Sequence, residues 1–168
     1  MNKLTDKEVR KSIESVRTEE DAVSVMNAYL TAQPELASYV EEASTSFNQA
    51  EKMFLMTAAS TVWNVIAGSG HDAPMITREM IGRTVADIDR EIRPALERAN
   101  DDTLSSMQAI VGQSSQGELL TALIGILLAA TEDDGDDRVR DESLQPLFFR
   151  IMIVIEVLSR TGNGRAVH

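Results

Sequence analysis

Apolar residues recur at helical spacing along most of the chain. Between residues 78 and 99, for example, Ile81, Val85, Ile88 and Ile92 step by four and three, which is typical of the narrow apolar seam of an amphipathic helix. The same periodicity predicts helices over residues 5–16, 19–32, 35–44, 47–67, 78–99, 103–112, 117–132 and 143–160. No segment shows the two-residue alternation of a half-buried strand. We therefore expect an all-α bundle of about seven to eight helices.

Residues that cap helix N termini support these boundaries. Three pairs have the spacing of a capping box, namely Thr5 with Glu8, Thr18 with Asp21, and Ser46 with Gln49. In a capping box each side chain accepts a hydrogen bond from a backbone N–H that the helix leaves free. Pro34 suits a first helical turn, where a missing N–H costs little. Pro94 lies inside a predicted helix and should kink or split it, because its ring clashes with the carbonyl of Arg90.

Three runs are apolar on nearly all sides of the predicted helix: residues 53–67, 119–130 and 147–158. Such helices are buried on most of their surface, so we expect two or three of them at the centre of the bundle. The breaks between helices are too short to be domain linkers. Residues 1–161 should therefore form a single helical domain, and residues 162–168 a flexible C-terminal tail.

The charge balance is strongly acidic. Asp and Glu number 27 against 16 Lys and Arg, which gives a net charge of −11 at pH 7. Nucleic-acid binding needs positive surface that displaces counterions from phosphate, so we expect no nucleic-acid partner.

The longest apolar stretch, residues 119–130, is too short to cross about 30 Å of hydrocarbon, so we expect no membrane span. The N-terminal residues lack the apolar core of a secretory signal, and there is no cysteine. These features predict a soluble, cytoplasmic protein.

No motif points to a catalytic, cofactor-binding or metal-binding residue. Ser69, His71 and Asp72 lie close together in the sequence, but the residues of a catalytic triad converge from separate elements, so we predict a loop here. Residues 132–137 contain five acids and one glycine. They form either a solvated acidic loop or a weak site for a divalent cation such as calcium, although the spacing lacks the first ligand of a calcium loop.

Charged residues also interrupt the apolar runs. Glu156 lies four residues before Arg160, which favours a surface stripe with that pair. Arg150 lies at the edge of the same run, where it can pair with an acid or bind a carboxylate or phosphate. We expect Glu51 to face solvent beside Lys52. If a pocket exists between the apolar helices, Arg150 and Glu156 are the polar groups that it would use.

Two functional classes remain open. The first is a non-enzymatic module that forms a homo-oligomer, most simply a homodimer, and binds or regulates another protein. Its contact would use large apolar side chains, which are enriched in interface cores: Met56, Trp63, Phe148, Phe149 and Met152. The alternative is an enzyme or small-molecule binder with an apolar pocket between helices, lined by Trp63, Met53, Met56, Phe148 and Phe149. We favour the first class, without a cofactor.

Overall fold

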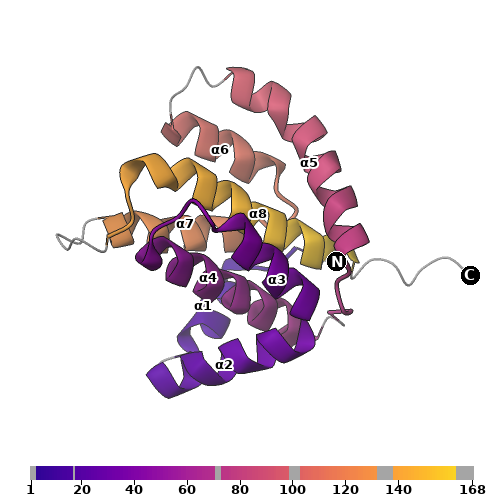
Figure 1. Cartoon of the computed structure of the whole chain (residues 1–168), viewed down its shortest axis with the longest axis vertical. Helices are drawn as coiled ribbons and strands as arrows, with labels where there is room; N and C mark the ends of the chain where they lie inside the picture. Colours follow the sequence, from indigo (N-terminus) through magenta and orange to yellow (C-terminus); the bar gives the residue numbers. More distant parts are fainter. Residues whose placement is uncertain (1–2, 17, 71–72, 99–102, 132–137, 162–168) are drawn as a thin grey trace, which may run out of the picture.

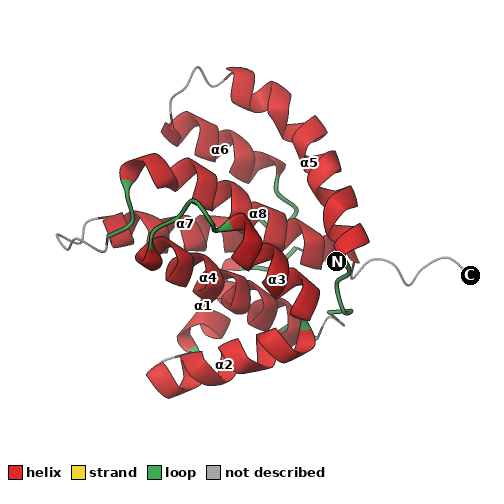
Figure 2. Cartoon of the chain, in the orientation of Figure 1, coloured by secondary structure: helices red, strands yellow, loops and turns green. Residues whose placement is uncertain are grey.

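The computed structural model describes residues 3–16, 18–70, 73–98, 103–131 and 138–161. These residues form α-helices and one short 3₁₀ helix, with no strand among them, so the predicted all-α bundle is confirmed (Figure 2). The helices are α1 (Asp6–Glu14), α2 (Glu19–Ala32), α3 (Pro34–Ala43), α4 (Gln49–Gly68), α5 (Arg78–Arg98), α6 (Thr103–Gln113), α7 (Gly117–Thr131), the 3₁₀ helix η1 (Asp141–Ser143) and α8 (Leu144–Thr161).

Local capping explains where several helices begin. The predicted boxes at Thr5 and Thr18 are both present, and Pro34 opens α3 as expected. The box predicted at Ser46 is wrong. Asn48 caps α4 instead, and its partner is Glu51, which accepts a hydrogen bond from the Asn48 backbone N–H at 2.9 Å. Asn is as good an N-cap residue as Ser, so residue type alone does not choose between the two positions.

The helix α5 is not split at Pro94. It continues to Arg98. Buried apolar residues on one face of α5, including Ile92 before the proline and Ala95 after it, pack against the rest of the bundle and keep the helix continuous. The loss of one hydrogen bond is tolerated where packing fixes the helix on either side. The rest of α5 is a charged, exposed surface with ion pairs one turn apart, such as Arg93 with Asp89.

Helix α8 is the centre of the bundle. It packs against α3, α4, α5, α6 and α7, and it crosses the middle of the molecule (Figure 1). Nine consecutive residues, from Ile151 to Ser159, are buried. Of the three apolar runs, this one has the longest stretch of consecutive buried residues. Both α4 and α7 bury one face and leave apolar side chains exposed on the other, including Met53 on α4 and Ile126 on α7.

Two buried glutamines fix the loops to this core. Gln33, at the junction of α2 and α3, accepts a hydrogen bond from the Ile76 backbone N–H at 2.9 Å and donates one to the Pro74 carbonyl at 3.0 Å. Gln116, before α7, accepts from the backbone N–H of Leu4 at 2.9 Å. The second contact ties the segment before α1 to the turn between α6 and α7, and so positions α1 on the bundle.

Candidate functional site

Helix α1 lies in the space beside both α4 and α7, with a groove on each side of it. It packs against α4 and α7, and its Val9 side chain is completely buried, together with Leu4 just before the helix. Ile13 is half-buried against the same core. Because α1 is only 9 residues long, it covers only part of the surfaces of α4 and α7 that face it.

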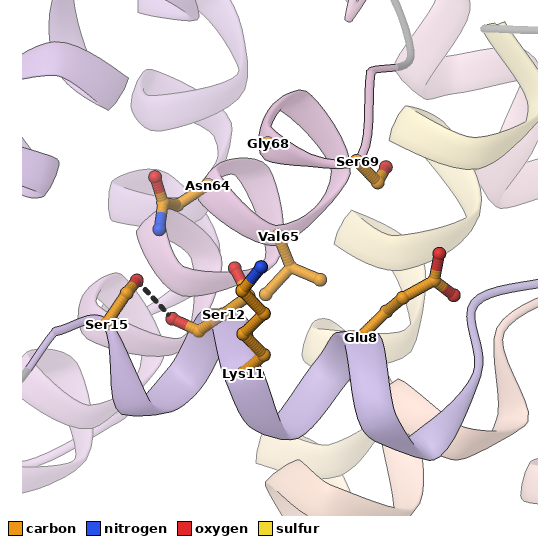
Figure 3. A pocket seen from close by; sticks show the side chains of 8 residues that line it. All are labelled: Glu8, Lys11, Ser12, Ser15, Asn64, Val65, Gly68 and Ser69. Carbon is orange, nitrogen blue, oxygen red and sulfur yellow. Dashed lines mark hydrogen bonds between the residues drawn. The ribbon is translucent and has the colours of Figure 1, made fainter.

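The groove between α1 and the end of α4 is polar. Its volume is about 460 Å³. The lining residues are Glu8, Lys11, Ser12, Ser15, Asn64, Val65, Gly68 and Ser69. In Figure 3 the Lys11 side chain rises from α1 towards α4, and Asn64 extends from α4 above Ser12 and Ser15. The groove brings together a carboxylate, an ammonium, hydroxyls and an amide.

The charges in this polar groove have structural roles. Glu8 belongs to the α1 capping box, where it accepts from the Thr5 backbone N–H at 2.8 Å and from the Thr5 hydroxyl at 2.7 Å. Lys11 lies next to the C-terminal end of α4, which attracts positive charge because the last carbonyls of a helix are free. Ser69 already donates to the Ile66 carbonyl there, at 2.7 Å. The hydrogen bonds of Glu8 and Ser69 thus lie at the ends of two helices, the start of α1 and the end of α4.

The groove between α1 and α7 is more apolar. Its volume is about 410 Å³. The apolar lining comes from Ile13, Ala122, Gly125 and Ile126, and the polar lining from Asp6, Arg10, Glu14, Glu118 and Thr121. Three of its four charged side chains are acidic, and the fourth, Arg10, is already paired with Asp6 at 2.8 Å. The groove therefore combines an apolar lining with a rim of net negative charge.

Gly125 lies in the apolar lining of this second groove. It lies in the interior of α7 with no positive φ, and a Cβ added to it would meet nothing within 4 Å. Glycine inside a helix costs roughly 0.5–1 kcal/mol relative to alanine. Neither backbone conformation nor packing within the chain requires it. Beside it, Ile126 and Leu128 leave 45% and 38% of their surface exposed. Around Gly125 the outer face of α7 is thus apolar and open to a close approach, and the acidic Glu118 lies two turns earlier on the same face.

A second exposed apolar face lies on α2, at the edge of the bundle (Figure 1). No charged residue occurs between Ala22 and Gln33. On this stretch Val23 and Leu30 are 54% and 41% exposed, and Met26 lies half-buried between them. Met75 is 63% exposed and belongs to the segment that Gln33 holds at the end of α2. A quarter of all residues in the chain are charged, so an outward helix face without charge stands apart from the rest of the surface.

The five residues predicted to form an interface do not share a surface. Phe148 and Met152 are buried in the core of the chain itself, and neither is free to contact another molecule. Met56, Trp63 and Phe149 are half-buried. The Trp63 ring lies 6.3 Å from the ring of the fully buried Tyr29, so much of its surface serves the contact between α2 and α4.

The two polar groups expected in a pocket are separated. Arg150 is half-buried and donates to the Tyr39 hydroxyl at 3.3 Å; no acid pairs with it among the described residues. Glu156 is buried, contrary to the predicted surface stripe, although its pairing with Arg160 is confirmed at 3.1 Å. It accepts hydrogen bonds from the turn between α6 and α7, including one from the Ser115 backbone N–H at 2.7 Å. The two side chains meet different elements and form no common site.

Glu51 is a buried charge that we expected to face solvent. Its side chain has no exposed surface, and Arg140 binds both of its oxygens, at 2.9 and 2.8 Å. The hydrogen bonds from Arg140, together with the Asn48 N-cap, lower the pKa of Glu51 from 4.5 to about 2. The contact fixes the segment that leads into α8 against the start of α4. The Asn48–Glu51 spacing was the only signal of this role in the sequence.

Several sequence predictions lie outside the described residues. His71, Asp72, the acidic residues 132–137 and the tail 162–168 are among them. Within the part of the chain that is described, no group of three or more His, Asp or Glu is arranged to hold a metal ion. None of the described helices has the length and hydropathy needed to cross a membrane.

Comparison with protein-family models, with curated proteins and with solved structures gave no match. The case for a function therefore rests on the surfaces of this chain: a polar groove, an acidic-rimmed apolar groove and an uncharged helix face.

Proposed function

We propose that this protein is a non-enzymatic interaction module that forms a homodimer through the outer face of α2. The observation that carries the proposal is the exposure of Val23 and Leu30 within residues 22–33, a stretch without charge that follows the acidic first turn of α2. Charged residues are depleted at the cores of protein interfaces, because burying an unpaired charge is costly. Two copies that each carry a net charge of −11 repel one another over most of their surface. The face of α2 is a place where they can meet without placing acid against acid.

The spacing of the apolar residues suits a two-fold contact. Val23 and Leu30 are seven residues apart, so they lie on the same side of α2, with Met26 and Asn27 between them. We consider two α2 helices that pack antiparallel, with the two-fold symmetry axis passing between Met26 and Asn27. In this arrangement Val23 of each copy faces Leu30 of the other copy. Such a contact is self-complementary, as a two-fold interface must be. Met75 extends the apolar surface beyond the end of α2.

The dimer contact would be small. One helix face and Met75 offer less than the roughly 800 Å² per partner of a standard interface, so we expect a dimer of micromolar affinity. Because the two copies carry the same charge, added salt should strengthen the association by screening the repulsion. This salt dependence is opposite to that of a contact held by ion pairs.

Light scattering after size exclusion tests the proposal with three variants. Val23→Glu and Leu30→Glu place a carboxylate within the contact and should shift the mass from two chains to one. Ala28→Glu is the matched control, because Ala28 is exposed but lies roughly 140° around α2 from Val23, and this variant should remain a dimer. Equal masses for all three variants and the unmodified chain would contradict a contact through Val23 and Leu30.

The alternative class, an enzyme or small-molecule binder, predicts a different result. A ligand that binds only the folded state raises the melting temperature. A reproducible rise with a metabolite, in a chain that stays monomeric, would favour that alternative over the proposed module.

A further inference from the structure

The apolar groove between α1 and α7 is a surface that the proposed dimer does not use. None of its lining residues belongs to α2, and it runs beside the exposed apolar side chains of α7. Its volume of about 410 Å³ and its apolar lining from Ile13, Ala122 and Ile126 suit one or two large apolar side chains of another molecule.

Gly125 indicates what kind of molecule approaches. Where a Cβ would meet nothing within the chain, the absence of a side chain leaves room for a foreign backbone. Thr121, one turn earlier on the same face, is also small and exposed. Gly82 on α5 has equally open surroundings but lies next to the ion pair of Glu79 and Arg83 and lines neither of the two grooves beside α1. At Gly125 the open position coincides with an apolar groove, which fits a helix packed closely across α7.

The rim of the groove decides between a second copy and another protein. Asp6, Glu14 and Glu118 outnumber Arg10 in its lining. In a two-fold contact both copies use the same surface. A second copy docked at this groove would therefore place its own acid-rich rim against the acid-rich rim of the first copy. A helix with basic residues at the edges of its apolar stripe meets the rim with complementary charge.

We propose that the groove between α1 and α7 binds an amphipathic helix of another protein, with apolar residues towards Gly125 and Ile126 and with Lys or Arg on its flanks. The helix-in-groove mode places apolar anchors of the partner one turn apart into such a groove. The basic flanks set the orientation of the helix and speed its association.

A designed peptide is the probe for this site. It is an amphipathic helix of about 18 residues with Leu and Ala on one face and Lys on both flanks, labelled with fluorescein. Binding to the full chain is followed by fluorescence anisotropy at physiological salt, where non-specific attraction between distant charges is screened. A scrambled peptide of the same composition and a peptide with Glu in place of Lys are the controls. The amphipathic basic peptide should bind at least about tenfold more tightly than either control.

Variants of the protein locate the binding. Gly125→Leu fills the space for the partner backbone and should weaken binding at least about tenfold, and Glu118→Gln should weaken it several-fold and reduce its salt dependence. Gly82→Leu is the matched control and should bind as the unmodified chain does. Equal affinity for the scrambled peptide, or an equal loss of affinity in Gly125→Leu and Gly82→Leu, would overturn the proposal.

The mass of Gly125→Leu in solution separates this site from the dimer contact. The mass should stay at two chains, and a drop to one chain would assign the groove to a second copy instead.

Discussion

Glu51 and Arg140 form an ion pair across 89 residues of sequence, and the glutamate in it has no exposed surface. The Arg140 backbone N–H also donates to the same carboxylate, at 3.0 Å. Since Arg140 immediately precedes η1 and α8, this single carboxylate positions the entry to the central helix. Its other oxygen caps α4, so one side chain joins the start of two core helices.

Replacing Glu51 with alanine should therefore destabilise the whole bundle. The change removes the carboxylate to which the Arg140 guanidinium and two backbone N–H groups donate, and we expect a loss of about 3 kcal/mol in the free energy of unfolding. Urea denaturation followed by circular dichroism measures this. Asp89→Ala, which removes an exposed pair with Arg93, is the control and should cost no more than about 0.5 kcal/mol. A similar small loss for Glu51→Ala would mean that the pair contributes little.

The low pKa of Glu51 also predicts how stability depends on pH. The pKa is about 2 in the folded protein and near 4.5 without the contact, so the unfolded chain takes up the proton first. The stabilisation is fully present above about pH 4.5 and is lost as the pH falls towards 2. Between these values the stability of the unmodified chain should fall more steeply than that of Glu51→Gln, measured by urea denaturation at each pH. Parallel curves for the two proteins would contradict the assignment.

Tyr29 offers a substitution that should stabilise the protein. Its hydroxyl is buried without a hydrogen-bond partner among the described residues, and burial raises the pKa of the phenol. Tyr29→Phe keeps the ring contact with Trp63 and removes an unsatisfied polar atom, so we expect a gain of about 1–2 kcal/mol. Tyr39→Phe is the matched control: it removes the acceptor of Arg150 and should be neutral or destabilising. A loss of stability in Tyr29→Phe would reveal a partner for the hydroxyl.

Glu156 and Glu91 both pair with Arg160, but they should differ in importance. Glu156 is buried and also accepts from the turn before α7, whereas Glu91 is half exposed and pairs with Arg160 alone among the described residues. We expect Glu156→Ala to cost about 2–3 kcal/mol and Glu91→Ala less than about 1 kcal/mol. Hydrogen exchange at the Ser115 amide should quicken in the first variant only. An equal loss of stability in Glu156→Ala and Glu91→Ala would mean that the exposed pair of Glu91 and Arg160 stabilises the protein as much as the buried contacts of Glu156.

The helices were predictable because their signals are local. Periodicity over a few turns and the caps at Thr5 and Thr18 lie within the segments that they describe, and the predicted boundaries agree with the structure to within a few residues. Even the error at Ser46 is a shift of two residues, since the cap lies at Asn48.

The burial of charge was not predictable in the same way. Whether Glu51 and Glu156 face solvent depends on partners about ninety and forty residues away, Arg140 and Ser115, which only the tertiary fold brings close. The same limit applies to the apolar runs. Composition marks α4, α7 and α8 alike as buried, but only α8 has a long run of consecutive buried residues, from Ile151 to Ser159. Which faces of α2 and α7 stay exposed depends on how the helices pack together. From the sequence we predicted Phe148 and Met152 as interface residues instead.

The mass of the chain in solution tests the central claim most directly. Size exclusion with light scattering at a loading of about 200 micromolar, well above the expected micromolar Kd, should give twice the chain mass of 18.4 kDa for the unmodified protein. It should give a single chain mass for Leu30→Glu, with unchanged helical circular dichroism. A single chain mass for the unmodified protein, at low and at high salt, would contradict the proposal that α2 joins two copies.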